Sequence, residues 1–235
     1  MDFIKNFFIS RENLNIIDIG TGNGDFIEII KASFDNIKSL TAIDINEKTE
    51  KLIKEKYPEV NFFKTDINKN NFSDGQFDIT CLSNTLHHIK NKNNLINQIK
   101  RITADSGYFI LMEMINDNLT DSQKSHMKIH HFAAKLDMLK GDYHENTMSK
   151  KDIIKIISEN FTIKAENVFL WEKSFISEET AENFDKIFSL KISTLEKSVQ
   201  EKLTDEKNTI INSVKGKEFQ VCPELILICS KNNFK

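Results

Sequence analysis

The feature that most restricts the fold is the segment LNIIDIGTGNG at residues 14–24, where an apolar run leads directly into a glycine-rich turn. Three of the chain's seven glycines, Gly20, Gly22 and Gly24, alternate there. A strand that turns sharply and lays bare backbone against a ligand needs residues without Cβ, and the N–H groups of the following helix then point at the ligand. The segment predicts a buried strand, a ligand-binding turn and a helix. Asp18 ends that strand, at the edge where open α/β sheets bind ligands.

The spacing of the glycines separates two kinds of ligand. A dinucleotide fingerprint is Gly-x-Gly-x-x-Gly, whereas this chain has Asp-x-Gly-x-Gly-x-Gly. This order resembles the first motif of class I S-adenosylmethionine-dependent methyltransferases. A glycine-rich turn that binds no nucleotide is the alternative interpretation. The resemblance implies that S-adenosyl-L-methionine is the cofactor and that the motif binds it through Asp18, Gly20, Thr21, Gly22 and Gly24.

Two further predicted strands also end in an acidic residue, Asp44 after SLTAI and Asp66 after VNFFKT. A carboxylate about 20 residues past the glycines can accept the ribose hydroxyls of an adenosine. We therefore expect Asp44 to bind the ribose and Ile45 to pack beside the adenine. The resemblance assigns Asp66 to the adenine amino group and the backbone of Ile67 to a ring nitrogen. Either aspartate alone could instead be a helix N-cap, but the joint pattern favours a cofactor site.

The segment FDITCLSNTLHHI at residues 77–89 contains a fourth strand and the string Asn-x-Leu-His-His. It resembles the fourth motif of small-molecule class I methyltransferases. In that family, Ser83 and Asn84 would meet the methionine end of the cofactor. His87 and His88 follow, and histidine has the pKa range of a general base. They are the candidate catalytic residues, and structural positioning is the alternative because the Leu-His-His segment occurs in members with very different substrates.

Strand and helix patterns alternate from residue 14 to about residue 115, which predicts a parallel sheet with right-handed crossovers. The last strand, EFQVCPELILIC, matches the antiparallel last strand of methyltransferases. The expected fold is α/β and Rossmann-like: a seven-stranded, mostly parallel sheet with an antiparallel last strand, helices on both faces and a helical lid. We expect one domain over residues 1–235, with a lid for substrate recognition at 117–160 and a helical insertion at 178–215.

The predicted lid contains an unusual group of histidines. On an ideal helix His126, His130 and Asp137 lie on one face, and Gly141 would let the chain turn back toward it. We expect a polar substrate pocket under the lid, and solvated surface residues are the alternative. The candidate substrate-binding residues are His130, His131, Asp137 and His144.

A metal site in the lid is a weaker alternative. His126 and His130 are one turn apart and could share an ion, but Asp137 lies about 10 Å further along the axis at 1.5 Å per residue. His144 or Glu113 would then have to be the third ligand. We therefore predict no resident metal.

The charge balance and the lengths of the apolar runs argue against some classes of protein. The chain has 32 basic and 35 acidic residues, a formal net charge of −3, without the basic excess typical of nucleic-acid or membrane binding. No apolar run approaches the roughly 20 residues of a membrane span. The opening MDFIKNFFIS lacks the length and cleavage site of a signal peptide. We therefore expect a cytoplasmic protein.

The sequence leaves three candidate functions open. The first is a methyltransferase that acts by in-line transfer on a small-molecule acceptor, which the sequence does not name. The second is a non-catalytic S-adenosylmethionine-binding regulatory or partner subunit, since an intact cofactor motif says nothing about the acceptor site. The third is an NAD-dependent enzyme, which the glycine spacing and the last strand disfavour. Besides a small-molecule substrate we expect no nucleic-acid or membrane partner, and a homo-oligomer is compatible with the sequence.

Overall fold

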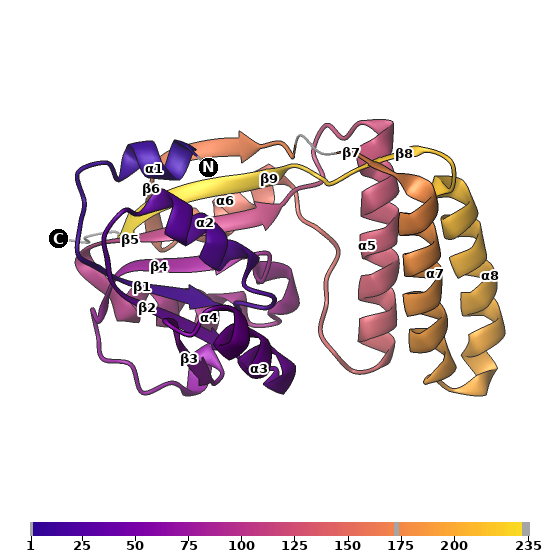
Figure 1. Ribbon diagram of the computed structural model, residues 1–235, viewed down its shortest axis with the longest axis horizontal. Coiled ribbons are helices and arrows are strands. Elements are labelled where there is room, and N and C mark those ends of the chain that lie inside the picture. The colour runs from indigo at the N-terminus through magenta and orange to yellow at the C-terminus, as the bar shows by residue number, and fades with distance from the viewer. Residues whose placement is uncertain (1, 172–173, 232–235) are drawn as a thin grey trace.

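The computed structural model describes residues 2–171 and 174–231, and its centre is a seven-stranded sheet (Figure 1). The strand order is β3-β2-β1-β4-β5-β9-β6. β9 is antiparallel to both of its neighbours, and the other pairings in this sheet are parallel. The strands are β1 (Leu14–Ile19), β2 (Ile37–Asp44), β3 (Asn61–Lys64), β4 (Phe77–Ser83), β5 (Thr103–Met114), β6 (Phe161–Phe169) and β9 (Glu224–Lys231). The predicted sheet is confirmed.

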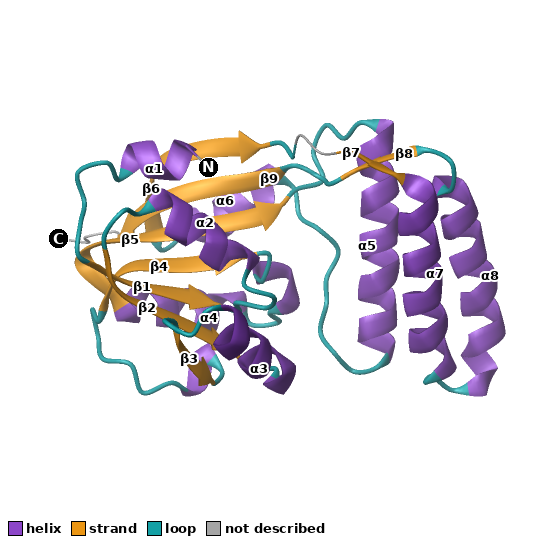
Figure 2. Ribbon diagram, viewed as in Figure 1, coloured by secondary structure: helices purple, strands orange, loops and turns teal. Residues whose placement is uncertain are grey.

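Helices cover both faces of the sheet, as predicted (Figure 2). One face packs against α1 (Asp2–Phe7), α2 (Asp25–Ser33) and α3 (Glu47–Lys56). The other packs against α4 (Lys92–Ile102) and α6 (Lys150–Ser158). Because both faces are covered, the central strands read as nearly continuous apolar runs rather than as alternating ones. Two short 3₁₀ helices, η1 (Ile67–Lys69) and η2 (Leu86–His88), follow strands at the carboxyl edge.

Three further helices form a bundle beside the carboxyl edge of the parallel strands (Figure 1). They are α5 (Asp121–Leu139), α7 (Ser177–Ser193) and α8 (Lys197–Val214). α5 begins with a capping box, in which Thr120 and Gln123 each bond the other's backbone N–H. The bundle core contains Ile129, Phe132 and Leu136 of α5, Phe188 and Ile192 of α7, and Leu203 and Ile211 of α8.

The segment 117–160, expected from the sequence to be a lid, divides between two places. α5 packs with α7 and α8 in the bundle. α6 packs on the sheet, where Ile153 and Ile157 are fully buried, as the crossover helix that precedes β6. The two helical segments at 117–160 and 178–215 therefore share one apolar core through α5.

The single last strand expected at 218–229 is two strands. β8 (Glu218–Gln220) pairs with β7 (Ser174–Ile176) in a small antiparallel sheet next to the bundle. The chain then passes through Pro223, which has no N–H to donate to a ladder, and only at Glu224 enters the central sheet as β9. The proline thus separates a bundle strand from a sheet strand.

None of the helices in the described part of the chain is long and apolar enough to cross a bilayer.

The bundle core gives a first testable prediction. Phe188 is 1% exposed and contacts Phe132 edge-to-face with ring centroids 5.1 Å apart. Phe188→Ala should lower the free energy of unfolding by about 3–5 kcal/mol, because it removes buried apolar surface and leaves a cavity. Leu190 lies on the same helix but is 71% exposed, so Leu190→Ala should change it by less than about 0.5 kcal/mol. Urea unfolding followed by circular dichroism compares the two, and equal effects would contradict the packing described.

Candidate functional site

Different local features explain why each of the three turn positions is a glycine. All three have positive φ, namely +71° at Gly20, +50° at Gly22 and +82° at Gly24. A Cβ at Gly20 would lie 2.6 Å from the Thr85 side chain, and one at Gly24 would lie 2.6 Å from the Tyr57 ring. At Gly22 the nearest atom would be 4.0 Å away. Packing therefore requires Gly20 and Gly24, whereas Gly22 leaves open a cradle that a side chain would fill.

Asp44, at the end of β2, lies against this turn. Its Oδ2 accepts a hydrogen bond from the Gly22 amide at 3.0 Å, and its Oδ1 accepts one from the Asn46 amide at 2.8 Å. The next residue, Ile45, is 72% exposed. The carboxylate and the apolar side chain therefore occupy the same end of the site as the glycines.

Asp66 has the capping role that the sequence left open. Its Oδ1 accepts hydrogen bonds from the Asn68 amide at 2.9 Å and from Asn68 Nδ2 at 3.1 Å, so that it caps η1. Both bonds go to the same carboxylate oxygen. Ile67, the first residue of η1, is 4% exposed.

Asp18 is the most perturbed group of the glycine motif. It is 1% exposed, and its Oδ2 accepts a hydrogen bond from Thr21 Oγ1 at 2.5 Å. Its Oδ1 is buried with no hydrogen-bond partner among the described residues. Burial raises the pKa of Asp18 to about 7, against the opposing Thr21 bond and with a smaller contribution from Asp44. An unpartnered buried carboxylate oxygen is costly, and a ligand N–H or ammonium group at the turn would satisfy it.

The end of β4 is fixed by Asn84, whose φ is +44°. Its Nδ2 donates to Glu224 Oε1, and its Oδ1 accepts from the Met114 amide at 3.0 Å. These bonds tie β4 to β5 and β9. Ser83 ends β4, and Thr85 donates from Oγ1 to the carbonyls of Ser83 (2.8 Å) and, in the turn, Gly20 (3.3 Å). The two motifs recognised separately in the sequence are therefore in direct contact.

Glu224 is a site residue that the sequence did not point to, and Glu113 entered only as a possible third ligand of a metal in the lid. Glu113 is 1% exposed and accepts from the Leu86 amide at 3.0 Å and from His87 Nδ1 at 2.6 Å. Glu224 is 3% exposed and accepts from Trp171 Nε1 at 2.8 Å. Burial raises the pKa of Glu224. The available signal was a single carboxylate in each of two apolar strands, YFILMEMI and ELILIC.

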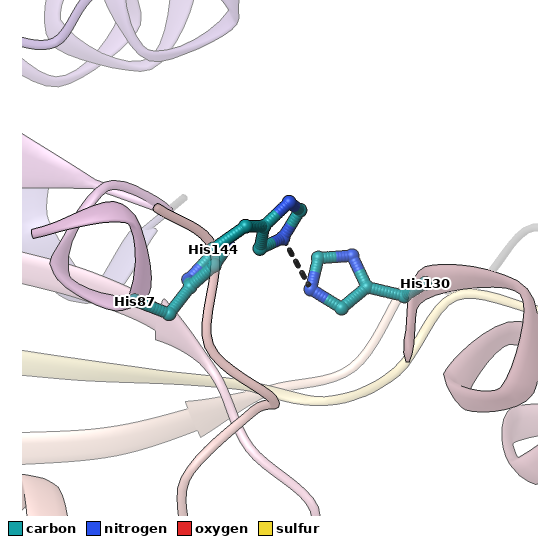
Figure 3. A group of neighbouring side chains, drawn as sticks. All are labelled: His87, His130 and His144. Carbon is teal, nitrogen blue, oxygen red and sulfur yellow. Dashed lines mark hydrogen bonds between the residues drawn. The ribbon is translucent and has the colours of Figure 1, made fainter. Parts of the chain in front are cut away.

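Three histidines from different parts of the chain converge, as Figure 3 shows. His87 follows β4, His130 lies in α5, and His144 lies in the loop between α5 and α6. One ring nitrogen of each lies within 4.8 Å of those of the other two, and His130 Nε2 and His144 Nε2 are 3.4 Å apart. Burial first, then the neighbouring His87 and His144, lower the pKa of His130 to about 3. His130 is therefore neutral near pH 7.

The other three histidines and Asp137 lie around this group, and Asp137 is bonded to one of its members. The His88 and His144 rings are in contact, with centroids 4.0 Å apart and planes tilted by 44°. His131 Nε2 contacts Thr147 Oγ1 at 3.0 Å, and His126 Nδ1 accepts from the Cys222 amide at 3.1 Å. Asp137 accepts from His144 Nδ1 at 2.9 Å and from Lys191 at 2.5 Å. Of the four histidines in the predicted lid, His130 and His144 therefore meet beside His87, whereas His126 and His131 bond elsewhere.

The buried Asp18 predicts how stability depends on pH. Its pKa is raised from an ordinary 3.8 to about 7, so between these values the unfolded chain ionises while the folded chain keeps its proton. The folded state is therefore destabilised as pH rises. Relative to Asp18→Asn, the wild type should lose up to about 4 kcal/mol of unfolding free energy between about pH 4 and pH 7, and little beyond. Urea unfolding of both proteins across this range measures the difference, and parallel pH profiles would refute it.

Comparisons with known proteins agree with this geometry. A family model described as a methyltransferase domain matches residues 17–111. The ubiquinone/menaquinone biosynthesis C-methyltransferase UbiE of Campylobacter jejuni is 26% identical over 107 residues, which is 44% of this chain and 46% of that enzyme. The chain therefore matches about half the length of this curated relative.

Solved structures show the same fold across the whole chain. A cyclopropane-fatty-acyl-phospholipid synthase-like protein from Lactobacillus casei has a TM-score of 0.67 at 13% identity, covering 97% of this chain and 89% of its own. An S-adenosylmethionine-dependent methyltransferase from Methanosarcina mazei has a TM-score of 0.59 at 15% identity, covering 98% and 97%. Residues 17–111 of this chain thus match a methyltransferase-domain family, and the sheet order and the glycine turn are those of class I S-adenosylmethionine-dependent methyltransferases, enzymes whose cofactor is S-adenosyl-L-methionine.

Proposed function

We propose that this protein transfers the methyl group of S-adenosyl-L-methionine to a small-molecule acceptor held between the carboxyl edge of the sheet and the helical bundle. The observation that carries the proposal is the glycine turn: Gly22 leaves an open cradle, and beside it Asp18 Oδ1 is buried without a partner among the described residues. The cofactor, when bound, supplies a methyl group already activated on a sulfonium. The chain has then mainly to align donor and acceptor.

The cofactor contacts follow from the same edge of the sheet. In our proposal the Asp44 carboxylate, already fixed by the Gly22 and Asn46 amides, accepts the ribose hydroxyls. The exposed side chain of Ile45 packs on the adenine. Asp18 accepts from the ammonium group of the methionine part, which satisfies its unpartnered oxygen. Asp66, Ile67 and Ser83 complete the pocket at its adenine and methionine ends.

The acceptor would contact the histidines that face this edge from the bundle. His130 and His144 are the proposed contacts, while Asp137 orients His144 by accepting from its Nδ1 at 2.9 Å. His131 is held by Thr147 and would take part only at the rim of the pocket. A base is needed only if the acceptor binds protonated. His87 is engaged by Glu113 at 2.6 Å, which leaves His88 as the more exposed ring. Burial and the neighbouring His87 and His144 lower the pKa of His88 to about 3, so it would be a weak proton acceptor near pH 7.

Loss of the Asp44 carboxylate gives the first test of this function. Asp44→Ala should weaken S-adenosylmethionine binding about 10- to 100-fold, because charge-assisted hydrogen bonds to the cofactor are lost. Glu47→Ala is the matched control, since Glu47 is an exposed carboxylate nearby whose side chain pairs with Lys64 instead. Isothermal titration calorimetry measures both affinities, with thermal unfolding to verify that each variant is folded. Failure of the folded wild type to bind would refute the function itself.

The cradle at Gly22 gives a second test. Gly22→Ala places a side chain at a φ of +50°, which strains the backbone, and fills the open space beside the turn. It should therefore lower cofactor affinity at least about 10-fold. Gly216→Ala carries a comparable strain at φ +71° with nothing within 4 Å, but at the end of the bundle. It should lower stability by about 1–2 kcal/mol without changing the affinity. An equal loss of affinity in both variants would contradict a ligand site at the turn.

Turnover separates the enzyme from the non-catalytic subunit. Incubation with S-adenosylmethionine carrying a labelled methyl group and a metabolite extract, followed by mass spectrometry, should give a small molecule that carries the label. Cofactor binding without any labelled product would favour the regulatory or partner subunit over the enzyme.

A further inference from the structure

The three converging histidines come from three separate elements of the chain (Figure 3). Their ligand atoms all lie within 4.8 Å of one another, and His130 Nε2 and His144 Nε2 are 3.4 Å apart. With Zn–N bonds of about 2.0–2.1 Å, two ligands of a tetrahedral ion lie about 3.3–3.4 Å apart. This pair therefore already has the spacing that a shared ion requires.

Two carboxylates set which nitrogen of the ring is available. Glu113 Oε1 lies 2.6 Å from His87 Nδ1, and Asp137 Oδ2 lies 2.9 Å from His144 Nδ1. A carboxylate accepts, so Nδ1 carries the proton in each ring and Nε2 keeps its lone pair. A carboxylate behind a ligating histidine fixes the ring orientation and makes the histidine a better ligand, and metal sites commonly have such a partner. Here two of the three histidines have one.

We propose that His87, His130 and His144 form a binding site for a divalent transition-metal ion, with zinc as the expected occupant. Imidazole nitrogens suit zinc and its neighbours, whereas magnesium and calcium prefer oxygen ligands. Three protein ligands leave a fourth position for water or another donor, as in catalytic rather than structural zinc sites. The third nitrogen lies within 4.8 Å of the other two, so each of its separations has to shorten by at most about 1.4 Å to reach the tetrahedral spacing.

A hydrogen bond between His130 and His144 is the competing interpretation. The two nitrogens are 3.4 Å apart. The usual donor–acceptor distance of an N–H hydrogen bond is shorter, about 2.7–3.2 Å. Such a bond would also leave the approach of His87 unexplained, although Glu113 is buried to hold that ring in place. Coordination explains all three rings and both carboxylates together.

An ion at this position would also link two parts of the structure. His87 follows Thr85, whose hydroxyl donates to the Gly20 carbonyl of the turn at 3.3 Å, while His130 belongs to the bundle. The ion would therefore join the bundle to the sheet edge next to the glycine turn. Its open fourth position would suit an oxygen, nitrogen or sulfur atom of the acceptor; this last point alone rests on the proposed function.

The site is tested on the full chain without S-adenosylmethionine, so that its failure is distinct from a failure of the proposed function. Protein stripped with a chelator is titrated with Co²⁺, observed by visible absorption, and the Co²⁺ is then displaced with Zn²⁺. We expect one ion per chain, tetrahedral absorption, a higher melting temperature with Zn²⁺ and no response to Mg²⁺. His130→Ala and His144→Ala should each weaken Zn²⁺ binding at least about 100-fold. His131→Ala, a change in the same helix next to His130, should leave it unchanged.

Two conservative variants test the supporting carboxylates. Glu113→Gln and Asp137→Asn should each lower Zn²⁺ affinity about 10- to 100-fold, and metal-free melting curves separate this from a loss of folding. Wild type that binds Zn²⁺ no more tightly than His130→Ala would overturn the proposal. An equal loss in His131→Ala would also overturn it, because the binding would then not depend on the three histidines.

Discussion

Removing a carboxylate from water is unfavourable unless hydrogen bonds replace the lost solvent, and this chain buries three at one edge of its sheet. Asp18 and Glu113 lie one residue before the ends of β1 and β5, and Glu224 begins the antiparallel β9, all at 3% exposure or less. The groups that compensate them define the edge. Glu113 holds the start of η2 and His87, and Glu224 holds Asn84 and Trp171. Asp18 keeps one oxygen without a hydrogen-bond partner among the described residues, and this is where our proposal puts the methionine part of the cofactor.

The part of the site that could be predicted is the part encoded locally. The glycine turn needs only its own spacing, and Asp44 needs only the rule that parallel strands end at one edge. The sheet followed from alternating strand and helix patterns. Each of these is set within a few residues or by topology that the chain order already contains. For the same reason the sequence could offer Asp66 both a capping and a ligand role, since an N-cap is also a local arrangement.

What could not be predicted depends on packing between distant segments. The helical repeat places His126 and His130 on one face of a helix, but it does not say which other segment that face contacts. In the structure His126 accepts from the Cys222 amide, whereas His130 lies beside His87 and His144. The division of the 117–160 segment has the same origin. Both helices are amphipathic, and only the completed core decides that α5 joins the bundle while α6 covers the sheet. The break at Pro223 likewise reflects the distance between the bundle and the sheet.

The place of β9 also bears on how the chain emerges during synthesis. Residues 224–231 leave the ribosome after every other described strand, yet they lie between β5 and β6. Until they arrive, the growing chain presents an unpaired apolar edge at β5, and β6 has no partner in the central sheet. Open edges of this kind attract other chains. In a nascent chain whose sheet forms before β9 emerges, this edge would stay open to such contacts until β9 inserts between β5 and β6.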